Sequence, residues 1–80
     1  MAQKKLQPNI YTQLNTDPLK YLIQNRSNNE LHLISSATQP LPNAKVDITL
    51  GLEMVITQNE VEGIFWGKPS GNRVAIVGIL

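Results

Sequence analysis

The 80-residue sequence contains no cysteine and a single histidine, His32. Disulfides are therefore excluded, and a zinc cage of cysteine and histidine ligands cannot be assembled. No apolar run approaches the roughly 20 residues of a membrane-spanning helix, and the lysines near the start are not followed by the apolar segment of a signal peptide. The sequence thus predicts no metal, no cofactor and no membrane partner.

Charged residues are also scarce, at 16% against roughly 25% in an average soluble protein. Seven Lys and Arg against six Asp and Glu give a net charge of +1, too little to attract nucleic acid over a distance. Six Gln and eight Asn take the place of charges, and amides cost less free energy than charges when a partner covers them. Because so short a chain is marginally stable and has no disulfide to add, we expect it to self-associate.

Alternation of apolar and polar residues is the main structural signal. In residues 44–50, Val46, Ile48 and Leu50 alternate with polar neighbours, as in a half-buried strand. Short segments of strand-forming residues recur at turn spacings typical of antiparallel proteins, over residues 10–14, 19–25, 31–35, 52–58, 62–67 and 73–80. The sequence predicts an all-β fold, a small antiparallel β-sandwich or barrel of six to seven short strands with almost no helix.

Turn residues predict two hairpins. Residues 68–72 contain proline, glycine and asparagine, which favour a chain reversal, so residues 62–67 and 73–80 are expected to pair as a final hairpin. The Asn28-Asn29 pair tolerates the left-handed conformation of a tight corner. It predicts a second hairpin from the segments on either side of it.

The first nine residues differ from the rest of the chain. Residues 1–9 are polar, with a proline at position 8, and predict a flexible or partner-bound N-terminal arm. Residues 10–80 are expected to form a single β-domain. Deleting residues 1–8 should then leave this domain folded.

Residue types that carry catalysis are few and poorly placed. His32, the one imidazole, falls in the middle of an expected strand, and we interpret it as a partly exposed strand histidine. Glu60 and Glu62 would point to the same side of an extended strand, but no apolar neighbours raise their pKa values, so a solvated strand end is the interpretation. We expect no catalytic residues and no enzyme.

Aromatic residues mark the candidate interface. Phe65 and Trp66 are adjacent and must point to opposite faces of a strand, so at most one belongs to the core. The interface candidates are Tyr11, Tyr21, Phe65, Trp66 and Leu80. Basic residues near the rings leave open a small β-barrel that binds single-stranded nucleic acid, but the near-zero net charge favours a protein partner over nucleic acid.

The order of features from about Lys20 to Leu80 resembles small virion proteins of tailed phages. The resemblance lies in the segment Tyr21-Leu22-Ile23-Gln24-Asn25 with its Asn-rich turn, the loop at Gln39-Pro40, Ile48-Thr49-Leu50-Gly51 leading into Glu53-Met54-Val55-Ile56, the Trp-bearing strand Ile64-Phe65-Trp66-Gly67 and a Val-rich last strand. At Thr49-Leu50-Gly51 the chain departs from the Pro-Gly turn of such proteins.

This resemblance implies a β-sandwich and a non-enzymatic structural role in the virion. Such a protein is made in the host cytoplasm and decorates or cements a capsid, or joins tail or fibre parts. Its expected partners are capsid or tail proteins and further copies of itself, with a trimer favoured. The alternatives are the nucleic-acid-binding barrel and an adaptor or inhibitor that masks a host protein.

Overall fold

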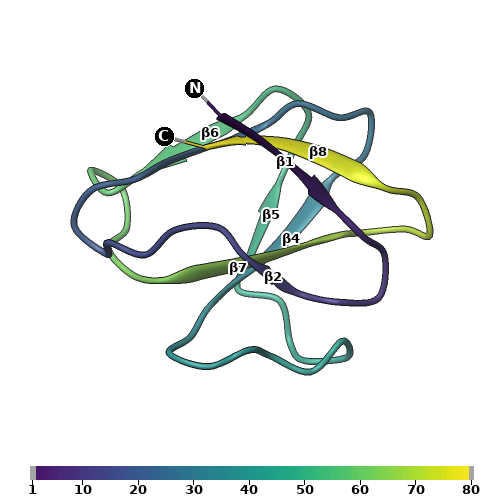
Figure 1. The fold of residues 1–80 in the computed structure, drawn as a ribbon, viewed down its shortest axis with the longest axis horizontal. Helices are drawn as coiled ribbons and strands as arrows, with labels where there is room; N and C mark the ends of the chain where they lie inside the picture. Colours follow the sequence, from purple (N-terminus) through teal and green to yellow (C-terminus); the bar gives the residue numbers. More distant parts are fainter. Residues whose placement is uncertain (1, 80) are drawn as a thin grey trace.

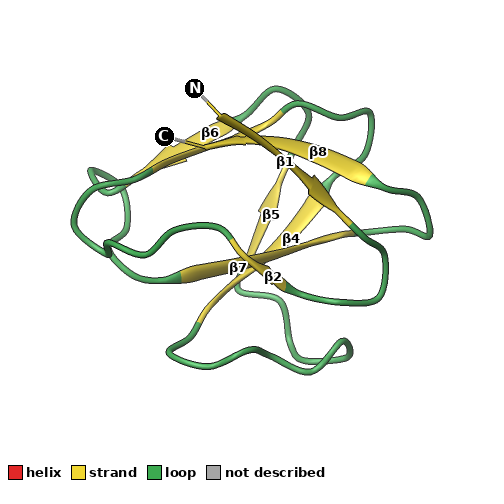
Figure 2. Ribbon diagram, viewed as in Figure 1, coloured by secondary structure: helices red, strands yellow, loops and turns green. Residues whose placement is uncertain are grey.

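The computed structural model describes residues 2–79, which form eight β-strands and no helix (Figures 1 and 2). The strands are β1 (Ala2–Leu6), β2 (Thr12–Gln13), β3 (Leu22–Asn25), β4 (Leu31–Ser35), β5 (Ile48–Leu50), β6 (Val55–Thr57), β7 (Phe65–Pro69) and β8 (Ala75–Ile79). They make two four-stranded sheets, sheet A in the order β1-β8-β3-β6 and sheet B in the order β2-β7-β4-β5. All pairs are antiparallel, so the predicted all-β antiparallel sandwich is confirmed.

The pairing follows a simple rule. Strand β1 pairs with β8, β2 with β7, β3 with β6 and β4 with β5, so the first half of the chain pairs with the second half in reverse order. The contacts of β3 with β8 and of β4 with β7 then complete the two sheets. A long antiparallel ribbon wound into two facing four-stranded sheets is the jelly-roll arrangement.

Both predicted hairpins are wrong. Strands β7 and β8 follow one another along the chain but lie in different sheets, and so do β3 and β4. The turn residues do reverse the chain, but each reversal also crosses the roughly 10 Å between the packed sheets. The backbone of the two connections is bonded to other segments: Ser70 N–H donates to Glu30 O, and Arg26 N–H donates to Ile76 O.

Most of the expected N-terminal arm, residues 1–9, forms a β-strand. Ala2–Leu6 forms β1 at the edge of sheet A, paired in register with β8 from Ala2 opposite Ile79 to Leu6 opposite Ala75. Leu6 is fully buried in the core. This polar segment is thus held by one buried apolar side chain and by pairing with β8. With β1 the domain has eight strands, one more than the six to seven that the sequence predicts.

Several strands are shorter than their sequence patterns. The alternating segment 44–50 contributes only Ile48–Leu50 to β5. The last bonds to β4 at this end come from Asp47, whose N–H donates to Leu33 O at 3.1 Å and whose carboxylate accepts from Ser35 N–H at 3.0 Å. Before Asp47, Ala44 N–H closes a turn onto Leu41 O. The turn therefore takes the first residues of the alternating segment out of the strand.

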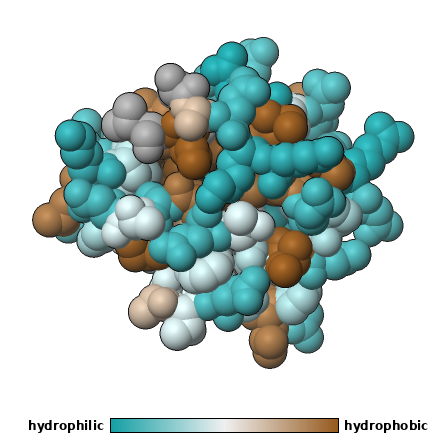
Figure 3. All heavy atoms as spheres, in the orientation of Figure 1, coloured by the Kyte–Doolittle hydropathy of each residue, from teal (hydrophilic) through white to brown (hydrophobic). Residues whose placement is uncertain are grey.

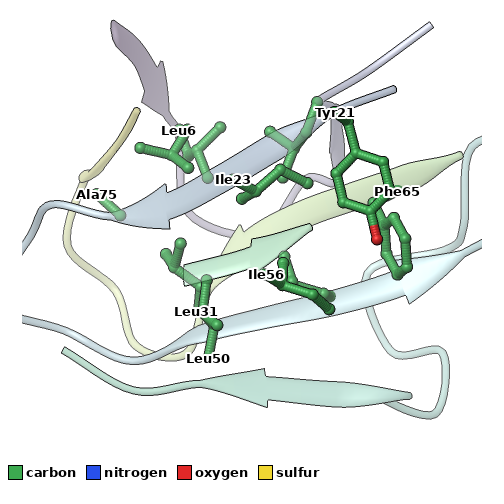
Figure 4. Packing of buried hydrophobic residues seen from close by; sticks show 11 residues of the cluster. Leu6, Tyr21, Ile23, Leu31, Leu50, Ile56, Phe65 and Ala75 are labelled. Atoms are coloured by element: carbon green, nitrogen blue, oxygen red, sulfur yellow. The ribbon is translucent and has the colours of Figure 1, made fainter. Parts of the chain in front are cut away.

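The core lies between the sheets (Figure 4). Its buried members come from both sheets and from the loops beside them, and they are Leu6, Leu14, Tyr21, Ile23, Leu31, Leu33, Leu50, Ile56, Phe65, Ala75 and Val77. The rings of Tyr21 and Phe65 pack at a centroid distance of 5.4 Å in a tilted arrangement. Such aromatic pairs add about 0.5–1.5 kcal/mol beyond the area they bury.

A second buried region lies on the outer face of sheet B. The long connection between β4 and β5, residues 36–47, hangs below this sheet in Figure 1. It is tied there by the Trp66 indole N–H, which donates to Ser36 O at 2.9 Å, and by the Gln39 side chain, which donates to Tyr11 O at 2.9 Å. Tyr11 is buried but is not part of the core between the sheets.

Candidate interaction surfaces

The structure buries most of the predicted interface residues. Tyr11, Tyr21 and Phe65 are at most 2% exposed, which corrects their assignment to a surface. Trp66 is half-buried, and Leu80 lies outside the described residues. Phe65 and Trp66 do face opposite sides of sheet B, as predicted, with Phe65 in the core. A platform of several exposed rings, which base stacking requires, is therefore not formed by these side chains.

Tyr21 fixes the loop between β6 and β7. Its hydroxyl donates to the carbonyl oxygens of Thr57, at 3.1 Å, and Val61, and its backbone N–H donates to the side chain of Gln58 at 3.0 Å. Burial raises the pKa of the Tyr21 hydroxyl, and the nearby Glu60 charge raises it further. The ring thus remains a neutral hydrogen-bond donor that holds both ends of the loop.

Two carboxylates project from this loop. Glu60 and Glu62 are exposed, and Val61 between them is 39% exposed. Glu60 Oε2 accepts hydrogen bonds from the backbone N–H and the hydroxyl of Thr57, each at 2.7 Å. These bonds lower the pKa of Glu60 below its usual value. We call residues 60–62 the acidic loop.

The opposite end of the sandwich is organised by a buried asparagine. Asn25 is fully buried. Its amide group donates to the carbonyl oxygens of Asn29 at 2.7 Å, Leu50 at 3.1 Å and Gly51 at 3.2 Å. Its side-chain oxygen accepts from the backbone N–H of Ser27 at 3.0 Å and from the Ser27 hydroxyl at 2.8 Å. One side chain therefore joins the β3–β4 loop to the β5–β6 loop.

A shallow cleft of about 340 Å³ lies beside this network. Arg26 and Arg73, both exposed, line it together with Ser27, Asn28, Asn29, Val74 and Ile76. The lining contains two guanidinium groups and no carboxylate, although Glu30 is on the same loop as Arg26 and Glu53 lines the neighbouring cleft. We call this the arginine cleft.

Apolar side chains are exposed beside one edge of sheet A. Leu52, Met54 and Val55 are each 43–55% exposed and lie on or just before the edge strand β6. In Figure 3, hydrophilic side chains cover most of the visible face and apolar residues form separate patches between them. Exposed apolar side chains beside an edge strand offer apolar area to a partner.

His32 occupies the place that the sequence predicts. It is half-buried on β4, opposite Lys68 of β7 in the register. Burial lowers the pKa of His32, the Lys68 charge lowers it further, and Glu30 acts weakly in the other direction. The ring is therefore uncharged near neutral pH, as expected of a strand histidine beside a cation.

Sequence reasoning missed Asn25 and treated basic residues only as neighbours of the aromatic rings. A signal for Asn25 existed: it alternates in step with Ile23 and so lies on the apolar face of its strand. A polar side chain on an apolar face needs hydrogen-bond partners inside the fold. No such signal pairs Arg26 with Arg73, which are distant in sequence.

Among residues 2–79, no helix is long and apolar enough to cross a membrane. Within the same residues, no group of three or more His, Cys, Asp and Glu side chains is placed to hold a metal ion. No family model, no curated protein and no solved structure matches this chain.

Proposed function

We propose that this chain is a non-enzymatic structural protein of a phage virion, which decorates or cements a capsid or joins tail or fibre parts through protein–protein contacts. The observation that carries the proposal is the strand order, β1-β8-β3-β6 facing β2-β7-β4-β5. Jelly rolls with two such sheets build viral capsid domains. The same architecture also serves lectins and cupins, so the surface must support the role as well.

The surface has the features of a protein that contacts other proteins. The edge strand β6 of sheet A lies beside exposed Leu52, Met54 and Val55. Methionine and arginine are enriched at protein interfaces relative to the rest of the surface. Buried polar side chains fix the loops at both ends, so these loops would lose little conformational entropy on binding.

The segments that carry the phage resemblance have structural roles in this sandwich. Residues 21–25 supply the Tyr21 ring and the central strand β3, and Trp66 on β7 holds the long connection over sheet B. The Val-rich end forms β8, which pairs with both β1 and β3. The resemblance therefore rests on residues that define the sandwich.

The test is made on particles. Virions purified from the phage that encodes the chain should contain this protein in a fixed number of copies, measured by quantitative mass spectrometry. Cross-linking should join it to a capsid or tail protein, and the isolated protein should sediment as an oligomer, with a trimer expected. Particles that lack the protein would contradict the proposal. Tight oligonucleotide binding that weakens steeply with salt would instead favour a nucleic-acid role.

A further inference from the structure

We propose that copies of this chain associate head to tail, with the acidic loop of one subunit seated in the arginine cleft of the next. The contact specifies the self-association that the proposed function includes. It is argued from the two loop ends, which carry opposite charges and matching arrangements of side chains.

The arginine cleft suits a carboxylate ligand. Arg26 and Arg73 line it together, and guanidinium groups bind carboxylates through two parallel hydrogen bonds. Arg26 is placed by its backbone, because its N–H donates to Ile76 O at 2.9 Å on strand β8. The buried side chain of Asn25 fixes the loop after Arg26, because it donates to Asn29 O and accepts from Ser27 N–H. Val74, 38% exposed, supplies an apolar surface next to Arg73.

The acidic loop has the complementary pattern. The acidic loop presents the exposed carboxylates of Glu60 and Glu62 on either side of the exposed Val61. The cleft presents the two guanidinium groups that would bind these carboxylates, together with an exposed valine of its own. Both Thr57 bonds to Glu60 end on Oε2, which leaves Oε1 available to a partner. Tyr21 anchors the loop backbone at Thr57 and Val61, so the carboxylates are presented on a fixed loop.

The two surfaces lie at opposite ends of the molecule. The β6–β7 loop lies at the left end of the long axis in Figure 1, and the β3–β4 and β7–β8 loops lie toward the right end. The long axis measures 31 Å, so one subunit cannot close the contact on itself. When the two surfaces of a subunit bind two different neighbours, the contact is heterologous, and repeated copies form a ring if the rotation closes or a filament if it does not.

The experiment uses two neutralised variants of the full chain. The cleft variant is Arg26→Gln with Arg73→Gln, and the loop variant is Glu60→Gln with Glu62→Gln, in which glutamine still offers Thr57 an acceptor. Sedimentation of the purified wild type should show concentration-dependent self-association that weakens as salt is added. Each variant alone should associate about tenfold more weakly than wild type, as expected for the loss of two exposed ion pairs.

Mixing the two variants separates this contact from any other. The cleft variant keeps an intact acidic loop and the loop variant keeps an intact arginine cleft, so one of each can form a single wild-type contact. The mixture should therefore contain one-to-one complexes that grow no further. Association through any other part of the surface would be the same in the mixture as in the separate variants.

Controls guard against loss of folding. Glu62→Gln alone changes an exposed side chain and should weaken association in the same direction, by a smaller factor. Lys5→Gln with Lys45→Gln removes two exposed charges elsewhere and should leave association unchanged. Circular dichroism should give the same spectrum for all variants.

The inference is overturned if wild type remains a monomer at all concentrations, if the variants associate as strongly as wild type, or if their mixture behaves like the separate variants. The measurements use purified protein, whereas the virion role is tested on particles. The head-to-tail contact can therefore fail while the protein is still found in virions, and the reverse.

Discussion

Replacing Asn25 should reveal how strongly the loop end depends on one buried side chain. In Asn25→Leu the side chain has similar size but no polar atoms, so the buried Leu50 carbonyl and the partly buried partners in the two loops lose their hydrogen bonds. A buried group left unsatisfied costs about 1–3 kcal/mol, and each partly buried bond about 0.5–1.5 kcal/mol. We expect the free energy of unfolding to fall by about 3–5 kcal/mol, a large part of the roughly 5–15 kcal/mol typical of domains.

Asn25→Asp tests the same reasoning through pH. The introduced carboxylate can still accept the Ser27 hydrogen bonds but would face three carbonyl oxygens without an N–H to donate. Burial and these oxygens favour the protonated form, so the pKa of the introduced carboxyl group in the folded variant should lie above the roughly 3.9 of the unfolded chain. The folded state then holds more protons than the unfolded state, and stability falls as pH rises between these two pKa values.

The assay is urea unfolding of wild type and Asn25→Asp from acidic to neutral pH. The difference in unfolding free energy should be smallest at the acidic end, where the carboxyl is protonated in both states and can donate one hydrogen bond. It should grow with pH and become constant above the folded pKa. A difference that does not change with pH, or an Asn25→Leu variant as stable as wild type, would refute the account of the network.

Five further substitutions test the packing. Gly63→Ala should destabilise the fold by about 1–3 kcal/mol, because Gly63 has φ of 149° and an added Cβ would lie 2.6 Å from the Ser35 hydroxyl oxygen. Gly71→Ala is the control: an added Cβ there has nothing within 4 Å, so the free energy of unfolding in the same urea assay should hardly change. Leu6→Ala should cost about 2–5 kcal/mol if β1 belongs to the core, and a circular dichroism melt unchanged by it would restore the idea of a dispensable arm. Phe65→Ala should cost about 3–5 kcal/mol and Trp66→Ala about half as much, since Trp66 is half-buried; the reverse order in thermal melts would contradict the assignment of faces.

The sequence by itself determined that the protein is an antiparallel all-β domain, a sandwich or a barrel, and how the side chains within a strand alternate between faces. Alternation is a property of neighbouring residues in one strand, so Ile48 and Leu50 and the opposite orientations of Phe65 and Trp66 could be predicted without knowing any partner strand. The turn residues likewise located the chain reversals. They could not show whether a reversal ends in the same sheet or in the facing one.

Tertiary structure alone decided the pairing, and with it the surfaces. Strand β1 became ordered because the edge of β8, at the other end of the sequence, was free to pair with it. Tyr11 and Tyr21 are buried because residues 36–47 pack near Tyr11 and the β6–β7 loop packs against Tyr21. Arg26 and Arg73 meet in one cleft because β3 and β8 are neighbours in sheet A. Each of these contacts joins residues distant in sequence, and the free energy that selects them is gained only when both sheets pack together.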